Sequence, residues 1–247
     1  MRSGRKVADL TSGPVGDPGS NGKHKFKRTV PKNLYGNYKV RTRFISDDGH
    51  ITVDTSQTIR VVKRVPPIAK KYRNTVTDVD PGHVLRFNAC DTVTIRYDDK
   101  ALPSKKRKAA LADLKWSANQ MTKLTKTPYK VVGKVNKRKP AKIFVKWGNP
   151  KGDALGIAYL KKFRHVSGNY WEITRTAISL DKRALAKDRN LRRSTMVHEL
   201  MHVAGRGHAK QSTGNIMTPR ARANEKFKAT AADRYAMKRL GRGYGCL

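Results

Sequence analysis

The chain has 247 residues and a formal net charge of +37, from 55 Lys and Arg against 18 Asp and Glu. This length allows one large domain or two modest ones with a buried core. No segment reaches the roughly 18 consecutive apolar residues of a membrane span. No apolar segment follows the basic N-terminal residues either, so we expect no signal peptide within this chain. The protein therefore either stays inside the cell or starts upstream of Met1.

The positive charge is spread along the chain. Residues 1–75 carry 17 Lys and Arg against 5 Asp and Glu, and residues 76–247 carry 38 against 13. The densest basic runs, Lys105–Lys108 and Lys137–Lys139, contain no aromatic residue that could stack on a base. We interpret them as solvated surface and expect no specific nucleic-acid site. Adhesion to polyanions, such as cell-wall polymers or acidic surfaces, is expected from the charge alone.

The N-terminal part begins with residues 1–25, which are rich in Gly, Pro, Ser and Asp and are predicted to form a flexible lead-in. Within residues 26–64, apolar and polar residues alternate from Tyr38 to Phe44 and again from Ile51 to Thr55. This period of two predicts antiparallel strands.

A hairpin turn is expected between these runs at Asp48–Gly49, and Ile59–Val62 forms a further β-rich run. Over about forty residues this β-rich segment resembles the last strands of an immunoglobulin-like or fibronectin-type sandwich. Pro66 and Pro67 then break the pattern, so residues 65–84 are predicted to be a linker.

Residues 85–247 are predicted to form an α+β domain. A strand is expected at Val93–Tyr97, and residues 104–125 place Leu111, Leu114 and Met121 on one helical stripe. Further strands are expected at Lys130–Val135, Lys142–Trp147, Gly156–Leu160 and Trp171–Leu180, and a final helix near Ala229–Leu240. This order favours a twisted mixed sheet with a long backing helix.

A candidate metal site lies in residues 198–208. His198 and His202 are four residues apart, so on a helix both imidazoles face the same side and can bind one zinc ion. Gly205 allows a sharp turn that can bring in His208 as a third ligand, which leaves one position open for water. Glu199 is rotated by about 100 degrees from His198, so it can reach this water as a general base but is not a ligand.

The segment HELMHVAGRGH fits the pattern H-E-x-x-H-x-x-G-x-x-H at every fixed position, and NIMTP follows at residues 215–219. In these motifs the chain resembles the metzincin clan of zinc metallopeptidases, and within it the matrixins. The resemblance implies a metalloendopeptidase in which a zinc-bound water, activated by Glu199, hydrolyses peptide bonds of a protein or peptide substrate.

The resemblance also implies roles for residues outside the zinc motif. Met217 would form the Met-turn beneath the histidines. Gly156 and Ala158 would lie on the edge strand that binds extended substrate. Thr218 and Pro219 would line the pocket for the side chain after the scissile bond. GNPKGDALGIAYL contains only Asp153 as an acidic residue, so the second metal segment of matrixins is expected to be absent.

The two cysteines, Cys90 and Cys246, match no metal-ligand spacing. They form either a disulfide, which implies an oxidising compartment, or two unrelated buried thiols. FNACDTVTIRY and the C-terminal Gly-Cys are similar to small bacterial secreted relatives, in which this pair would tie the first strand of the domain to its end. The resemblance thus implies an extracellular location.

Several alternatives remain open from the sequence. Ser194 is a candidate cap of the metal-binding helix. Arg206 either meets a substrate carboxylate or lies in solvent. Tyr235 and Tyr244 either approach the metal as transition-state donors or lie in the core or at the surface. A polyanion-binding module with a vestigial site and a hydrolase of non-peptide amides are the competing functions.

Overall fold

The structure is a computed structural model. It describes residues 36–45, 51–61, 65, 67–76, 83–136, 138, 140–150, 152–167, 169–211, 214–219 and 227–247. The expected lead-in of residues 1–25 and the turn at Asp48–Gly49 lie outside these residues. Within them, none of the helices combines the length and the apolar character that crossing a membrane requires.

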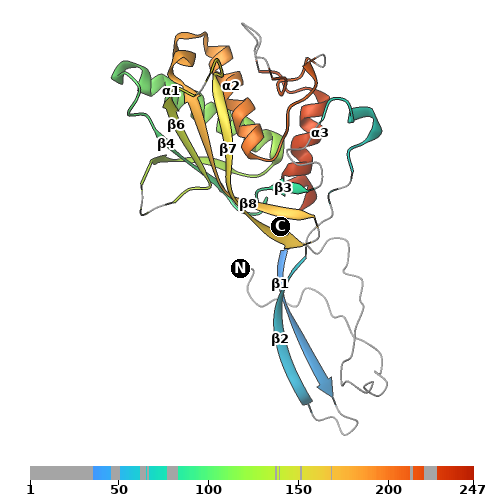
Figure 1. The fold of residues 1–247 in the computed structure, drawn as a ribbon. Helices are drawn as coiled ribbons and strands as arrows, with labels where there is room; N and C mark the ends of the chain where they lie inside the picture. The colour runs from blue at the N-terminus through green and yellow to red at the C-terminus, as the bar shows by residue number, and fades with distance from the viewer. Residues whose placement is uncertain are drawn as a thin grey trace. The chain divides into compact units, whose positions relative to one another are not determined.

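The N-terminal described element is a β-hairpin. Strand β1 (Gly36–Ile45) pairs antiparallel with β2 (Ile51–Val61), from Gly36 opposite Val61 to Ile45 opposite Ile51 (Figure 1). The predicted antiparallel strands are confirmed. The two β-rich runs after the turn form one strand, because the pairing continues without a break through residues 56–58.

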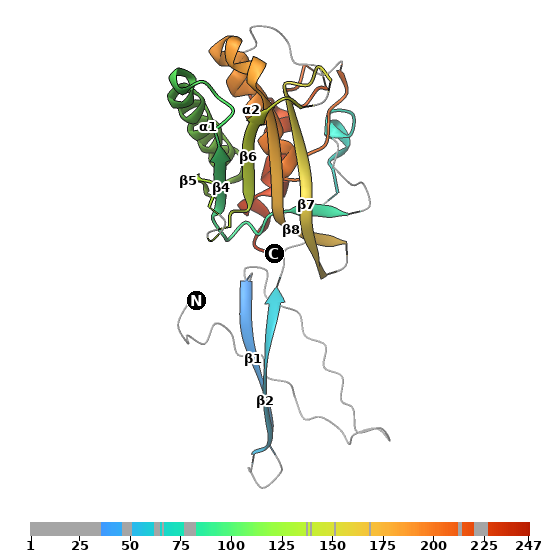
Figure 2. The ribbon, with the colours of Figure 1, turned by 60° about the vertical axis from the view of Figure 1, so that its left-hand side comes forward.

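The rest of the described chain is built on a six-stranded sheet. Its strands are β3 (Val84–Arg86), β4 (Val93–Asp98), β5 (Tyr129–Lys134), β6 (Ile143–Gly148), β7 (Gly156–Ser167) and β8 (Tyr170–Asp181). The order is β3-β8-β6-β4-β5, and β7 also pairs with β8 (Figure 2). Only the β7–β8 pair is antiparallel. The mixed sheet with its helices is compatible with the predicted α+β class.

Strand β7 lies at an edge of the sheet, and its pairing with β8 is irregular. The register is regular from Gly156 to Leu160 and then shifts between Leu160 and Lys162, between Lys162 and Phe163, and between His165 and Ser167. The strand continues to Ser167, seven residues beyond the predicted end at Leu160.

Three α-helices accompany the sheet in the described residues: α1 (Ser104–Thr125), α2 (Arg189–Val203) and α3 (Ala231–Leu240). Short 3-10 helices occur at η1 (Lys70–Tyr72), η2 (Lys182–Ala186) and η4 (Arg242–Tyr244). Helices α1 and α2 lie on the same face of the sheet (Figures 1 and 2). Helix α1 has the predicted bounds, and its Leu114 and Met121 are buried in the main core. That core also contains Ile95, Ile143 and Ile178 of the strands, which fix the sheet beneath α2.

The chain before β3 packs against α3. Val76 is buried in a small cluster with Ala232 and Ala236. The Tyr235 hydroxyl accepts from the Ala69 N–H at 2.9 Å and donates to the Pro67 carbonyl at 3.3 Å. Residues 67–76, which the sequence assigned to the linker, are thus attached to the last helix of the following domain.

The predicted disulfide is present. Cys90 and Cys246 are bonded with their Cα atoms 5.1 Å apart, and 156 residues separate them in sequence. The bond joins the segment between β3 and β4 to the residues after η4, and it excludes the alternative of two free thiols.

Candidate metal centre

Helix α2 carries the candidate ligands. Its N-cap is Asp188, whose side chain accepts from the N–H groups of Asn190 and Leu191. The expectation that Ser194 caps the helix is wrong, because Ser194 lies in the second turn. Buried apolar residues, including Met196 and Leu200, attach the opposite side of the helix to the core.

Helix α2 ends at Val203, and two residues later the chain turns at Gly205, where a side chain would clash. Gly205 has a φ of +101°, in the left-handed region. A Cβ atom at this position would lie 1.9 Å from the Leu85 carbonyl oxygen. Because the chain turns tightly here against β3, it can return to place His208 beside His202.

The three predicted histidines converge on one point. The His202 Nε2 atom lies 3.0 Å from Nε2 of His198 and 3.1 Å from Nε2 of His208. On the opposite ring nitrogens, His198 Nδ1 lies 2.7 Å from the Ile216 carbonyl oxygen and His202 Nδ1 lies 2.7 Å from that of Arg206. The three imidazoles thus form a group close enough to hold a metal ion.

The hydrogen bonds of the rings determine what this group can bind. A carbonyl oxygen only accepts, so Nδ1 of His198 and of His202 carries the hydrogen, and Nε2 of each neutral ring holds a lone pair. Two lone pairs facing each other at 3.0 Å repel unless a proton or a cation lies between them. Burial disfavours the protonated form. The donor set therefore fits a metal cation.

The pKa values of all three imidazoles are lowered. Burial is the main cause for His198, with a pKa of about 4, and for His202, with a pKa of about 3, which His198 lowers further. Burial, together with Arg206, also lowers the pKa of the more exposed His208. At neutral pH the three rings are uncharged, which is the state that metal coordination requires.

Glu199 is a buried carboxyl group next to these ligands. It is 5 % exposed, and burial raises its pKa to about 8. Gly156, at the start of β7, lies directly against it. A Cβ atom on Gly156 would lie 2.6 Å from Glu199 Cγ and 2.9 Å from Cδ. Because glycine has no side chain, Glu199 can lie directly against position 156.

An open cleft of about 800 Å³ connects these groups. Its lining residues are Asp153, Ala154, Leu155, Gly156, Ile157, Ala158, Leu160, Leu191, Ser194, Thr195, His198, Glu199, His202, His208, Ile216, Thr218 and Pro219. The four residues predicted to contact substrate, Gly156, Ala158, Thr218 and Pro219, are all among them. The cleft thus runs between the regular half of β7 and the histidine-bearing side of α2.

Met217 lies in the core beside this cleft and is not one of its lining residues. Its side chain is fully buried. The preceding residue, Ile216, supplies the carbonyl that binds His198, and the Met217 carbonyl accepts from the Ala209 N–H at 2.8 Å. This turn therefore holds the first histidine and the residue after the third one.

Three further expectations are resolved by the side-chain positions. Both alternatives for Arg206 are wrong, because its side chain is fully buried and does not line the cleft. Tyr235 binds the segment before β3, and Tyr244 lies in η4 near Val65 and Leu247. Neither tyrosine lines the cleft in the described part of the chain.

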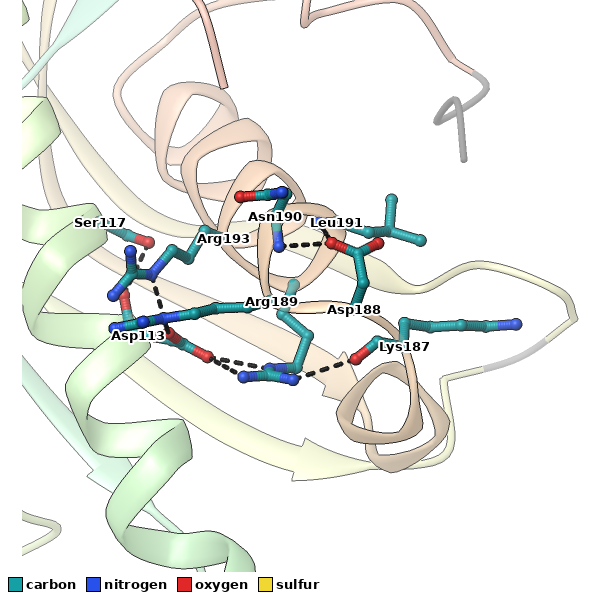
Figure 3. Close-up of polar contacts among 9 residues, drawn as sticks. Asp113, Ser117, Lys187, Asp188, Arg189, Asn190, Leu191 and Arg193 are labelled. Carbon is teal, nitrogen blue, oxygen red and sulfur yellow. Dashed lines mark hydrogen bonds and ion pairs between the residues drawn. The ribbon is translucent and has the colours of Figure 1, made fainter. Parts of the chain in front are cut away.

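A second polar cluster, which the sequence did not reveal, fixes the other end of α2. Asp113 of α1 is buried, and its two carboxylate oxygens accept from Arg192 Nε at 2.9 Å and from Arg193 Nε at 2.8 Å. Arg189 lies 3.7 Å from the same carboxylate. The Arg193 guanidinium also lies over the Trp116 ring at 4.7 Å. Figure 3 shows how these arginines of α2 gather around the one aspartate of α1.

Neither a family model nor a curated protein gives a relative for the chain. Any statement on its function therefore depends on its own residues.

Proposed function

We propose that this chain is a zinc-dependent metalloendopeptidase of the metzincin type. The observation that supports it most is the convergence of three imidazole Nε2 atoms, beside the buried carboxyl group of Glu199, in one open cleft. Three imidazoles suit zinc among the common divalent metals. The Met-turn motif and the glycine between the second and third histidines add sequence support for this family.

In this proposal His198, His202 and His208 hold the zinc ion, and Glu199 moves the proton. When bound, zinc supplies Lewis acidity toward the substrate carbonyl and lowers the pKa of water. A divalent cation beside Glu199 also favours its carboxylate form and opposes the effect of burial. Glu199 then accepts a proton from the attacking water and donates it to the leaving amine. The regular part of β7 offers main-chain groups to an extended peptide.

The disulfide supports a secreted protein, because such bonds persist in oxidising compartments. The net charge of +37 supports adhesion of the enzyme to anionic surfaces near its substrates.

The proposal is tested by measuring zinc content and the cleavage of a fluorescently labelled denatured protein. We expect close to one zinc ion per chain, and cleavage that a chelator abolishes and added zinc restores. Glu199→Gln is expected to keep the zinc and to lower kcat about 10²- to 10⁴-fold, whereas His202→Ala loses the metal.

Glu172→Gln is a matched control, because Glu172 is also buried but pairs with Arg164 away from the cleft. It is expected to keep cleavage and zinc. Cleavage by Glu199→Gln at the wild-type rate would remove Glu199 from the mechanism, and a wild-type chain without bound metal would remove the metal centre.

A further inference from the structure

The turn between the second and third metal ligands is held from outside the metal site. It comprises Gly205, Arg206 and Gly207. Two main-chain hydrogen bonds connect the turn to α2. The Gly205 N–H donates to the His202 carbonyl at 2.9 Å, and the Arg206 N–H donates to the Met201 carbonyl at 3.0 Å. The Arg206 carbonyl then accepts from His202 Nδ1 at 2.7 Å. The position of this carbonyl therefore determines how the His202 ring is oriented.

The Arg206 side chain fastens this turn to the chain before β3. It is fully buried. Its Nη1 donates to the Gly207 carbonyl at 2.8 Å, and its Nη2 donates to the Thr75 carbonyl at 2.9 Å. Thr75 is adjacent to Val76, which is buried against α3. One guanidinium thus binds within the turn and joins the turn to Thr75, 131 residues earlier in the sequence.

We propose that Arg206 is a positioning residue of the metal centre, which holds the carbonyl that orients His202 by binding Thr75. This role rests on the proposed metal site. Groups that bind the non-coordinating nitrogen of a metal-ligating histidine fix its tautomer and ring orientation, and their loss typically weakens metal binding about 10- to 100-fold. Through Thr75, the segment of residues 67–76 thereby helps to fix the geometry of the metal centre.

The planar guanidinium suits this task better than another cation. It presents fixed donors in two directions, so it can bind the carbonyls of Thr75 and Gly207 together. A lysine at this position carries the charge but lacks the rigid fork. It is expected to restore part of the metal affinity and not all of it.

The test is zinc affinity, measured on the full chain by competition with a chromophoric chelator. Arg206→Met keeps most of the volume and removes the donors, and it is expected to weaken zinc binding at least tenfold. Arg206→Lys is expected to fall between this variant and the wild type. The visible spectrum of the cobalt(II)-loaded protein is expected to change in Arg206→Met, because the ligand geometry changes.

Arg86→Met is the matched control. Arg86 is equally buried, and it also donates to carbonyls, those of Gly241 and Gly245. It is expected to lower the melting temperature without changing zinc affinity. Zinc binding by Arg206→Met within twofold of the wild type would overturn the role of Arg206. If Arg206→Met does not fold, the same outcome in Arg206→Lys overturns it. A wild-type chain that binds no zinc would overturn the metal centre itself, and the role of Arg206 with it.

Discussion

Two buried carboxyl groups lie near opposite ends of helix α2, and their surroundings differ. Asp113, at its N-terminal end, is 1 % exposed and is bound by Arg192 and Arg193. Glu199, toward its C-terminal end, is 5 % exposed, and burial alone raises its pKa to about 8. Asp113 thus has charged partners, whereas the pKa of Glu199 is set by burial.

The carboxyl group with charged partners stabilises the fold, and the one without them suits the proposed proton transfer. Arginines in the first turn oppose the helix dipole, because that end of a helix already carries partial positive charge. They are stable there because Asp113 of α1 pairs with them, and this pairing also joins the two helices. A carboxylate held in this way gives up its partners only at great cost. Among the described residues no arginine pairs with Glu199 in this way, so a change in its protonation state breaks no ion pair, as its proposed role requires.

The largest expected effect comes from removing the charge of Asp113. Asp113→Asn leaves the half-buried Arg192 and Arg193 without this counterion, and we expect a loss of about 3–5 kcal/mol in the free energy of unfolding. Urea denaturation at constant zinc concentration measures it. Arg189→Gln is the control, because Arg189 is 65 % exposed and 3.7 Å away, and we expect a change below about 0.5 kcal/mol. Equal effects of the two substitutions would contradict the comparison.

A smaller effect is expected from Glu199, with a different pH dependence. In the metal-free protein its raised pKa means that the folded state binds more protons than the unfolded state between pH 4.5 and about 8. Stability contributed by the protonated group is therefore lost as pH rises through this range. Glu199→Gln removes the loss, so we expect it to stabilise the chelated protein by about 2–4 kcal/mol at pH 8 and little at pH 5.

This prediction is checked by urea denaturation of both proteins in chelator at the two pH values. The lowered pKa values of His198 and His202 act in the opposite direction, since they reduce stability as pH falls below 6.5. Their effect is common to both proteins and cancels in the difference. An equal change at pH 5 and pH 8 would show that burial does not hold Glu199 protonated.

The smallest expected effect concerns the space beside Glu199. Gly156→Ala places a Cβ atom against Glu199 Cγ, and we expect a cost of about 1–2 kcal/mol. The same substitution in a Glu199→Ala background is expected to cost almost nothing, because the contact is gone. Thermal denaturation of the wild type, the two single variants and the double variant measures both costs. A cost that persists without the Glu199 side chain would place the strain elsewhere.

Much of the fold could be predicted because its patterns are local. Helix α1 has the predicted bounds, since Leu114 and Met121 recur at helical spacing and become core. Strand β3 was not predicted, because three residues are too few to show a period. Strand β7 was predicted to end at Leu160. Its register shifts and its charged residues Lys161, Lys162 and Arg164 remove the alternation on which strand prediction depends.

The candidate site also has parts that local sequence patterns predict and parts that they do not. The spacing of His198 and His202 is a property of one helix, so it can be read from the sequence. The contacts of Gly156 with Glu199, of Arg206 with Thr75 and of Asp113 with Arg193 join residues distant in the chain. Only tertiary packing brings them together. An arginine also gives no sequence sign that it will be buried, which explains why Arg206 was assigned to substrate or solvent.

The irregular edge of β7 has a consequence for self-assembly. An exposed strand edge can recruit a second copy of the same chain and start a fibril. The longest regular stretch of β7, Gly156–Leu160, is about 16 Å long at 3.3 Å per residue. Beyond it, shifted pairing and the exposed side chains of Lys161, Lys162 and Arg164 interrupt the template. The edge that we propose for peptide binding thus resists growth of the sheet from molecule to molecule.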